Sequence, residues 1–490
     1  MTVAAFTAAV SGWGFFLWTY VFGVVLILGG IYFTIRTRFV QFTILRDAFR
    51  TIAGKDKEAN AETSSANKPQ TALSAFQAFC VSESSRVGTG NVVGVAVAIV
   101  WGGPGSIFWM WIMAIIGAAT GFVEATLGQV YKENHGDRFM GGAMYYFQRA
   151  FKSHTPSYIH AAILAFTYVF VFNSVQTNTV ADTFQGFTFQ GFELERLHIG
   201  IALSAAIMFI IFGGIKRISQ VASILMPPII ISYLIVCFGI VFINFPQFIT
   251  TMGYIVSSAF GTEQAAGGAL GFTFAQAIQH GLRRGLFSNE AGIGSVPIGA
   301  STSSVSHPVK QGAVQSFGVL LDTLVICSAT AFIILMSGPY QAGTTAVGVP
   351  LVRESLAYWV GSGFAVPFLN IMLFLLPFTS LIGNYFYGET CFRFIAKSQT
   401  AVNVFKILGG FTIIIASVVP LQLVWSMADI FTGTLATLNI IALFILCNVA
   451  VKSLDHYKKQ MKDFRDGTGK EPVFYDDEIG IDTPYWKRDR

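Results

Sequence analysis

Long apolar runs alternate with short polar stretches along almost the whole chain. The run Trp13–Ile35 has 23 residues and no charged side chain, which is long enough for a helix to cross roughly 30 Å of hydrocarbon. It is too long for a signal-peptide core and lacks a basic segment before it, so we expect it to be retained. Ten more runs are similar: 71–100, 105–131, 158–185, 198–215, 219–244, 265–300, 311–336, 363–390, 401–420 and 423–450. The pattern predicts an all-α polytopic membrane protein of about 11 transmembrane helices.

Two of these predicted spans are interrupted by helix breakers and polar side chains. The second contains SESSRVGTGN (82–91) and the seventh contains GLRRGLFSNEAGIGS (281–295). Non-helical backbone survives at membrane depth only where protein buries it or where it lines a cavity, and there its free N–H and C=O groups can bind a ligand or ion. Close helix packing through Gly90/Gly94 and Gly281/Gly285 is the structural alternative. The added Arg, Asn, Glu and Ser favour two discontinuous helices.

The two interrupted spans are five apart, and five spans reverse the direction of the chain. Spans two to six and seven to eleven therefore fit an inverted 5+5 repeat, with one extra N-terminal helix. This pattern is typical of secondary transporters. The expected organisation is an N-terminal helix and loop (1–70), two repeats (71–244 and 262–450) and a tail (451–490) that begins as a helix end and continues as disorder.

Charge distribution predicts the orientation. If the N-terminus is outside, the inner segments hold 26 of the 31 Lys and Arg residues and the outer loops hold Arg196 and Arg353. The net charge of +5 is thus explained by positive-inside bias rather than by nucleic-acid binding. The chain has no CxxC and no HExxH or GxSxG motif, so we expect no disulfide, no cofactor and no enzymatic activity. A channel is less well supported, because the polar groups cluster at two breaks instead of forming rings along a pore.

Several segments resemble the alanine or glycine:cation symporter family. They are IRTRFVQF (35–42), RVGTGNVVGVAVAIVWGGPGSIFWMW (86–111), GFVEATLGQVYK (121–132), FNSVQTNT (172–179), FGGIKRI (212–218), RGLFSNEAGIGSVP (284–297), HPVKQG (307–312) and FTSLIGNYFYGE (378–389). The resemblance covers nearly the whole transmembrane region in order. It implies a leucine-transporter-type fold and import of a small neutral amino acid with sodium, or sometimes protons, across the plasma membrane.

The substrate is expected at the breaks. Gly88, Thr89 and Gly90 should form the unwound turn of span two, and a half-helix starting near Asn91 should present its N-terminus to a carboxylate. Asn91 is either a helix cap or a substrate contact. Carbonyls in the second break should receive the substrate ammonium. The other candidates are Phe287, Ser288 and Asn289 in that break, Gln176 in span four, Asn384 in span nine and, from the resemblance alone, Gln77. Packing, capping and interhelical bonding are the alternatives for these residues.

The coupling ion has two candidate sites. The resemblance places a sodium ion between hydroxyls of Thr379 and Ser380 in span nine and carbonyls of Val87 and Gly88; bonding of the hydroxyls to their own helix is the alternative. Glu83 makes a proton-coupled importer of another small neutral amino acid the second hypothesis, although Arg86 lies one turn away and would keep that carboxylate ionised.

Other charges receive structural interpretations. We expect Glu290 to hold its break through backbone N–H groups or through Arg283 and Arg284. The carboxylates Glu124, Asp182, Asp322 and Glu389 are expected near span ends, as gate or packing charges.

The predicted topology, with the N-terminus outside and the C-terminus inside, can be tested by cysteine labelling in intact cells. An impermeant maleimide should reach cysteines introduced in 337–360 and should not reach cysteines in 36–70. Labelling of the 36–70 loop would contradict the orientation.

Overall fold

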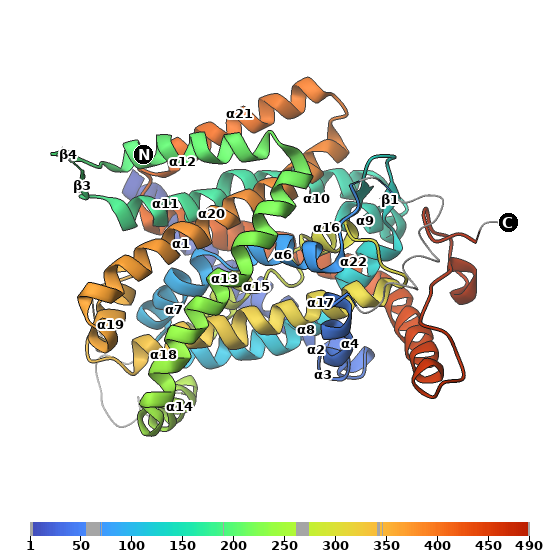
Figure 1. Ribbon diagram of the computed structural model, residues 1–490, viewed down its shortest axis with the longest axis horizontal. Helices are drawn as coiled ribbons and strands as arrows, with labels where there is room; N and C mark the ends of the chain where they lie inside the picture. Colours follow the sequence, from blue (N-terminus) through green and yellow to red (C-terminus); the bar gives the residue numbers. More distant parts are fainter. Residues whose placement is uncertain are drawn as a thin grey trace.

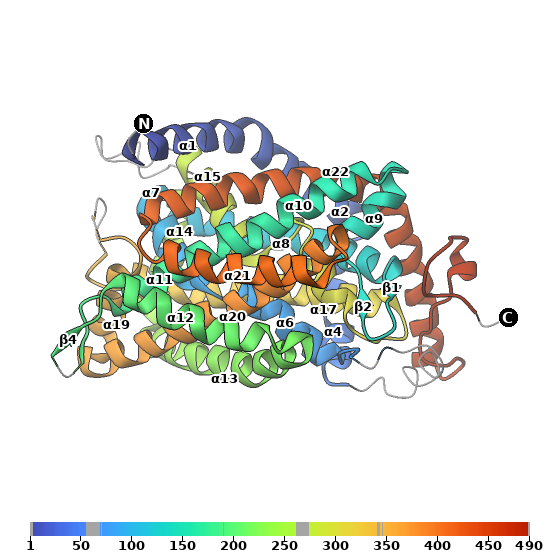
Figure 2. The same ribbon diagram turned by 90° about the horizontal axis from the view of Figure 1, so that it is seen from above.

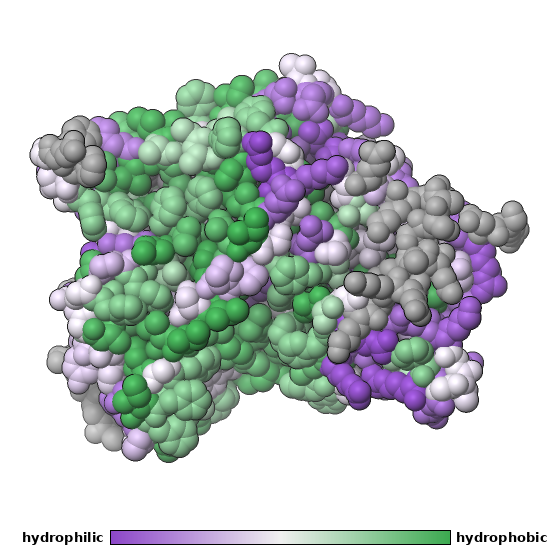
Figure 3. Space-filling view, in the orientation of Figure 1, coloured by the Kyte–Doolittle hydropathy of each residue, from purple (hydrophilic) through white to green (hydrophobic). Residues whose placement is uncertain are grey.

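The computed structural model describes residues 3–54, 69, 71–189, 191–260, 274–340, 344 and 346–488. Its helices run mostly along one direction, with the N- and C-termini at opposite ends of the long axis (Figures 1 and 2). Hydrophobic residues cover the middle of the molecule, and hydrophilic residues gather at the end that carries the C-terminus, which we call the tail end (Figure 3). This distribution is that of a protein surrounded by lipid along its length.

Eight helices of the described residues are long and apolar enough to cross a membrane. They are Ala9–Arg36, Gly105–Val130, Thr155–Phe184, Gly214–Ile243, Pro308–Leu335, Ser362–Ile395, Gln399–Ala416 and Leu421–Arg465. The three remaining predicted spans hold two broken helices and the shorter apolar helix Arg196–Ile211. The all-α membrane class is therefore confirmed, while the number eleven stays a prediction. Part of the 36–70 loop, the start of the 265–300 span and part of 337–360 lie outside the described residues.

The first half of the chain folds into helices joined by short loops and two small hairpins. Its elements are α1 (Val3–Leu17), η1 (Trp18–Phe22), α2 (Gly23–Arg36), α3 (Val40–Thr43), α4 (Leu45–Ile52), α6 (Ala75–Arg86), η2 (Gly90–Gly94), α7 (Val95–Gly102), α8 (Gly105–Val130), β1 (Glu133–Asn134), β2 (Phe139–Met140), α9 (Ala143–Phe151), α10 (Thr155–Phe166), η3 (Thr167–Phe172), α11 (Asn173–Phe184), β3 (Thr188–Phe189), β4 (Phe192–Glu193), α12 (Arg196–Ile211), α13 (Gly214–Ile243) and α14 (Phe245–Ala259). Each hairpin is antiparallel, β1 with β2 and β3 with β4.

The second half is helical throughout its described elements. They are α15 (Phe274–Asn289), α16 (Val296–Ser301), α17 (Pro308–Leu320), η4 (Leu321–Cys327), α18 (Ser328–Leu335), α19 (Val349–Val360), α20 (Ser362–Ile395), α21 (Gln399–Ala416), α22 (Leu421–Arg465) and η5 (Asp476–Ile479). Four of the five η elements are π-helical turns, a distortion frequent at functional sites: η1, η3 and η4 lie inside longer helices, and η2 begins the helix Gly90–Gly102.

Helices from the two halves pack beside one another in matching order. The third predicted span, α8, lies along the eighth (α17), the fourth (α10 and α11) along the ninth (α20), and the fifth (α12) along the tenth (α21). Such pairing is what a two-fold relation between the halves produces. The division into two repeats itself stays a prediction.

The tail differs from its prediction. Helix α22 continues to Arg465, and residues 466–488 fold onto the tail end instead of being disordered. Phe474 and Trp486 are 0% and 3% exposed. The charged composition suggested disorder, but these two aromatic side chains give the segment enough apolar surface to pack.

Candidate functional site at the two helix breaks

The first break separates α6 from η2. Val87 is extended (φ −80°, ψ 93°), and Gly88 and Thr89 connect it to the helix that starts at Gly90. Asn91 spans the break, because its Oδ1 accepts a hydrogen bond from the Gly88 N–H at 2.9 Å. The Thr89 N–H donates to Gln176 Oε1 at 3.0 Å. Both predicted amides thus stabilise non-helical backbone at this depth, which apolar side chains cannot do.

The second break separates α15 from α16. Glu290, Gly292 and Gly294 all have positive φ angles, of 57°, 92° and 96°. Glu124 of α8 accepts a hydrogen bond from the Gly292 N–H at 2.9 Å, and Asn439 of α22 donates to Glu124 at 2.8 Å and to the Gly292 carbonyl at 2.9 Å. The break is therefore fixed by polar groups from two other helices.

The position of Glu124 differs from the one expected. It is fully buried and binds the backbone of the second break, whereas its position had suggested a charge near a span end. The predicted span 105–131 did not reveal this role, because Glu124 lies in its last third. Its acceptor function became visible only once Gly292 was placed beside α8.

The two breaks lie side by side and bond to each other. Asn91 Nδ2 donates to Ser288 Oγ at 3.0 Å. Ser85, the residue before Arg86, has its hydroxyl 2.9 Å from Glu290 Oε1 and 2.7 Å from Asn384 Oδ1. Residues about 200 positions apart in sequence are thus in direct contact, and Asn384 joins them from α20.

Asp322 is the main residue that sequence reasoning placed wrongly. It lies in η4, in the middle of the helix Pro308–Leu335, and is fully buried. Its Oδ1 accepts from Asn91 Nδ2 at 2.6 Å, and its Oδ2 accepts from Ser288 Oγ at 2.5 Å and Thr323 Oγ1 at 2.9 Å. Its position near the centre of the predicted span 311–336 was the signal that could have identified it.

The carboxylate of Asp322 accepts hydrogen bonds through both of its oxygen atoms. Within the described part of the chain, no Lys, Arg or His nitrogen forms an ion pair with it. A buried carboxylate without a countercharge is costly. The cluster of Asn91, Ser288 and Asp322 therefore supplies negative charge and oxygen atoms at the place where the two breaks meet.

Three aromatic rings cover the breaks. Phe287 makes edge contacts with Phe172 and Trp425, with ring centroids 4.9 and 4.8 Å apart. A Cβ added at Gly90 would lie 3.0 Å from Phe287 Cδ1, which is a tight contact. The space beside the first break is therefore narrow, and glycine at position 90 keeps the backbone close to the ring.

The two predicted hydroxyls of α20 behave differently. Ser380 Oγ lies 3.4 Å from the Val87 carbonyl and 3.1 Å from the Leu376 carbonyl, and a Cβ at Gly88 would lie 2.2 Å from it. Thr379 Oγ1 donates only within its own helix, to the carbonyls of Leu375 and Leu376. The structure thus brings Ser380, Val87 and Gly88 together. Thr379 follows the alternative interpretation, in which its hydroxyl bonds to carbonyls of its own helix.

Of the two remaining candidates, Asn289 lies at the breaks and Gln77 does not. Asn289 donates to Thr323 Oγ1 at 3.2 Å and accepts from the Ala291 N–H at 3.0 Å, so it belongs to the second break. Gln77 forms a capping box with Ser74 at the start of α6, far along the helix from the break, and is not brought to the cluster.

Buried ion pairs flank the site. Arg86 Nη1 binds Glu83 Oε1 at 2.9 Å and Arg86 Nη2 donates to Gln315 Oε1 at 2.9 Å. Arg283 and Arg284 both pair with Asp429 of α22. Glu290 was expected to bind backbone N–H groups or these arginines, but the arginines pair with Asp429 instead, and the donors to Glu290 are the hydroxyls of Ser85 and Ser295, the latter at 3.0 Å.

Close helix packing, the alternative to a helix break, explains one pair of glycines, Gly281 and Gly285. A Cβ at Gly281 would lie 2.5 Å from the Ser106 carbonyl oxygen, and one at Gly285 would lie 3.1 Å from Met113 Cβ. These glycines let α15 approach α8 closely. They are part of the helix that precedes the break and not of the break itself.

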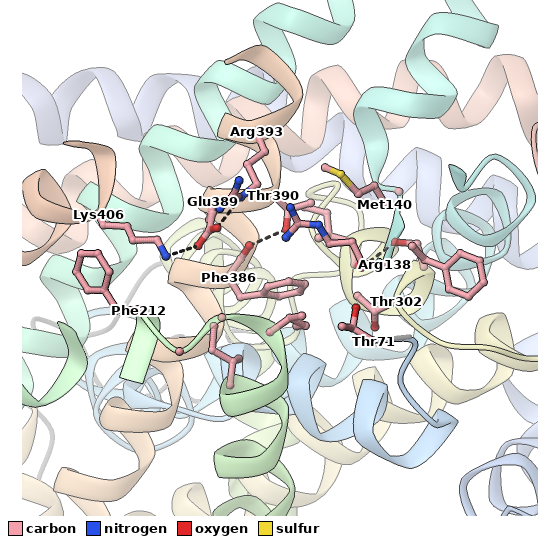
Figure 4. A pocket seen from close by; sticks show the side chains of 18 of the residues that line it. Thr71, Arg138, Met140, Phe212, Thr302, Phe386, Glu389, Thr390, Arg393 and Lys406 are labelled. Atoms are coloured by element: carbon pink, nitrogen blue, oxygen red, sulfur yellow. Dashed lines mark hydrogen bonds and ion pairs between the residues drawn. The ribbon is translucent and has the colours of Figure 1, made fainter. Parts of the chain in front are cut away.

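A cavity of about 240 Å³ opens at the tail end, between β2, the start of α13, the end of α16 and the end of α20 (Figure 4). Three cations line it, Arg138, Arg393 and Lys406, with a single carboxylate, Glu389. Figure 4 shows Glu389 between Arg393 and Lys406, and the nitrogen–oxygen distances are 2.6 and 3.6 Å. This mouth therefore carries net positive charge.

Comparisons with known proteins identify the family. The model of the sodium:alanine symporter family matches residues 3–474. The probable sodium/glutamine symporter GlnT of Bacillus subtilis strain 168 is 44% identical over 461 residues, covering 94% of this chain and 91% of that protein. The amino-acid carrier protein AlsT of the same strain is 40% identical over 459 residues, covering 94% and 92%.

A solved structure also matches most of the chain. It is that of Mhp1, a nucleobase-cation-symport-1 family transporter in a closed conformation with bromovinylhydantoin bound, with a TM-score of 0.48 and 13% identity over 80% of this chain and 81% of that one. The family match, in contrast, extends over almost the full length at high identity. The chain belongs to the sodium:alanine symporter family, whose members are multi-pass membrane transporters and not enzymes.

Proposed function

We propose that this protein imports a small neutral amino acid together with sodium by alternating access. The observation that carries the proposal is the direct contact of two broken helices through Asn91, Ser288 and Asp322. Paired breaks at membrane depth offer backbone dipoles of both signs to one zwitterionic ligand. Alanine or glycine is the substrate we propose.

The proposed binding mode uses both breaks. The substrate carboxylate lies at the N-terminus of the η2–α7 half-helix, near Gly90 and Asn91, where the helix dipole is positive. The ammonium group faces the second break and the Asp322 carboxylate, which gives that buried charge a partner. The side chain points toward Phe287.

The aromatic rings favour a small substrate. Phe287 is held between Phe172 and Trp425 and lies close to Gly90, so a short side chain fits there better than a long one. The 44% identity to a protein called a probable sodium/glutamine symporter favours glutamine as a second candidate. A polar amide needs both donors and acceptors, and of the three rings Trp425 alone offers a polar group, its indole N–H, which is a donor only.

Sodium is the proposed coupling ion. Ser380 Oγ and the Val87 carbonyl converge on the first break and are neutral oxygen ligands. Glu83 already pairs with Arg86 at 2.9 Å, so a structural ion pair explains this carboxylate without a role in proton coupling. The protein is proposed to lie in the plasma membrane, with its N-terminus outside and the tail-end cavity on the cytoplasmic side.

Counterflow in proteoliposomes tests the substrate and the ion together. Vesicles loaded with unlabelled alanine should accumulate labelled alanine and glycine in sodium buffer, and accumulate little in choline buffer. Labelled glutamine should accumulate weakly. Accumulation of glutamine at the same rate as alanine would replace the proposed substrate, and accumulation driven equally well by a pH gradient without sodium would replace the ion.

The substrate site predicts a severe effect of Gly90→Leu. A side chain at position 90 meets Phe287 and blocks the backbone at the first break, so substrate affinity should fall at least about tenfold while the protein still inserts. Equilibrium binding of labelled alanine to purified protein measures this. Gly239→Leu is the matched control, because a Cβ at Gly239 meets no atom within 4 Å. Unchanged alanine affinity in Gly90→Leu would refute the placement.

The ion site predicts different effects for neighbouring hydroxyls. Ser380→Ala should raise the sodium concentration for half-maximal uptake several-fold, because it removes an oxygen that faces Val87. Thr379→Ala should change it less, because Thr379 bonds within its own helix. The Glu83→Gln protein that folds should show the same sodium dependence of uptake as the unchanged protein. If Glu83→Gln abolishes a proton-driven uptake that Ser380→Ala leaves intact, the sodium assignment is wrong.

A further inference from the structure

The last part of the chain forms a strap, which we define as residues 466–488. It turns back after α22 and lies beside the tail end of the bundle (Figures 1 and 2). The strap has internal order, because the Asp476 N–H donates to the Trp486 carbonyl at 2.9 Å and Asp476 Oδ2 accepts twice from Thr483 at 3.0 Å. It is therefore a folded element with a defined contact face.

The strap bonds to the segment that follows the second broken helix. The Phe474 N–H donates to the Ser306 carbonyl at 3.0 Å, and Ser306 Oγ donates to the Pro472 carbonyl at 2.8 Å. Ser306 lies five residues after Ser301, the end of α16. The two bonds fix the exit of α16 to the strap.

A lysine connects the strap to α8. Lys132 Nζ lies 3.9 Å from the ring centroid of Phe139, 4.8 Å from that of Tyr485 and 4.9 Å from that of Trp486. It also donates to the Ser303 carbonyl at 2.9 Å. Cation–π contacts of buried lysine are strong because the ammonium is desolvated. One side chain thus ties together α8, the strap and the segment after α16.

Trp486 adds a second tie to α8. Its Nε1 donates to the Gln129 carbonyl at 2.7 Å, and its ring is almost fully buried. The side chain of Gln129 in turn donates to the carbonyls of Ala300 and Ser303. Removing Trp486 would therefore loosen the strap and the end of α16 together.

The tail-side ends of both broken helices meet at this place. The Leu73 N–H donates to the Thr302 carbonyl at 3.0 Å, and the Ser304 N–H donates to the Leu73 carbonyl at 3.0 Å. Leu73 lies two residues before the start of α6, and Thr302 directly follows α16. Under alternating access, opening the tail end requires these two segments to separate or to move together away from α8.

We propose that the strap is an autoinhibitory latch that holds the tail end of the transport route closed. It joins the exit of α16 to α8, and through Leu73 it also restrains the start of α6. Displacing the strap frees both half-helices to open. The proposal rests on the alternating access described under the proposed function.

The latch is tested by the accessibility of the segment after α16 that it is proposed to hold in place. Thr302→Cys places a thiol on a buried residue that lines the tail-end cavity, and mass spectrometry measures its modification by a soluble maleimide. Combining Trp486→Ala with Thr302→Cys should accelerate modification of the thiol about fivefold or more. Losing a cation–π contact and a hydrogen bond shifts the equilibrium between the closed and open tail end by about that factor. Lys487→Ala is the matched control, because Lys487 is exposed and pairs only with exposed Asp482.

A second variant separates loss of the latch from loss of folding. Residues 465–470 are exposed, so a protease site inserted there can be cut after the protein has folded. Cutting should accelerate modification of Thr302→Cys, and both treatments should raise the initial rate of counterflow. Unchanged modification after cutting, or after Trp486→Ala at an unchanged melting temperature, overturns the latch. Because modification needs no substrate, absent counterflow with faster modification would count against the proposed function alone.

Discussion

Polar backbone at membrane depth has to be satisfied by the protein itself, and much of this structure follows from that requirement. Two helices are interrupted, and each interruption exposes N–H and C=O groups that water cannot reach. Asn91 supplies part of these hydrogen bonds. Its Oδ1 accepts from the Gly88 N–H, and its Nδ2 donates to Ser288 and Asp322. One short side chain therefore fixes the shape of one break and its distance from the other.

The neighbouring helices carry the remaining partners. Glu124 and Asn439 bind the second break, Gln176 binds the first, and Thr330 donates to the Asn91 carbonyl at 2.7 Å. Each of these side chains comes from a different helix, so the bundle cannot be rearranged around the breaks without replacing several hydrogen bonds. The close approach of α15 to α8 at Gly281 serves the same end, because it brings Glu124 within reach of Gly292.

The sequence predicted the class of fold and the two breaks, because apolar run length and the glycine-rich interruptions are local signals. Asn91 and Ser288 were expected at the breaks for the same reason, whereas Ser380 was expected beside Val87 only from the family resemblance. Asp322 and Glu124 were not assigned to the centre, because Asn91 and Gly292, the partners that place them at the breaks, lie more than 150 residues away in sequence. Gln77 had only a family resemblance in its favour, and the local S-x-x-Q capping signal described its position better.

For the tail, the sequence predicted disorder where the structure has a folded segment. Its charges suggested disorder, yet Tyr485 and Trp486 pack on Lys132 just after α8, and Phe474 packs on Trp486 and His307. Composition averages over a segment, whereas packing depends on a few side chains that match a surface formed elsewhere in the chain. Polar contacts add to this packing, because Glu471 pairs with Arg50 and Lys310 and the Val473 N–H donates to Gln460.

Ser85 illustrates what the contact between the breaks means for motion. Its hydroxyl lies within reach of Glu290 at the second break and of the Asn384 amide on α20. A serine hydroxyl donates one hydrogen bond and accepts others, and the Nδ2 of Asn384 is buried with no partner among the described residues. With that amide turned so that Nδ2 faces Ser85, the hydroxyl donates to Glu290 and accepts from Asn384 at the same time. α6, the second broken helix and α20 are then joined at one oxygen atom, so a movement of any one of them strains its bonds to the other two.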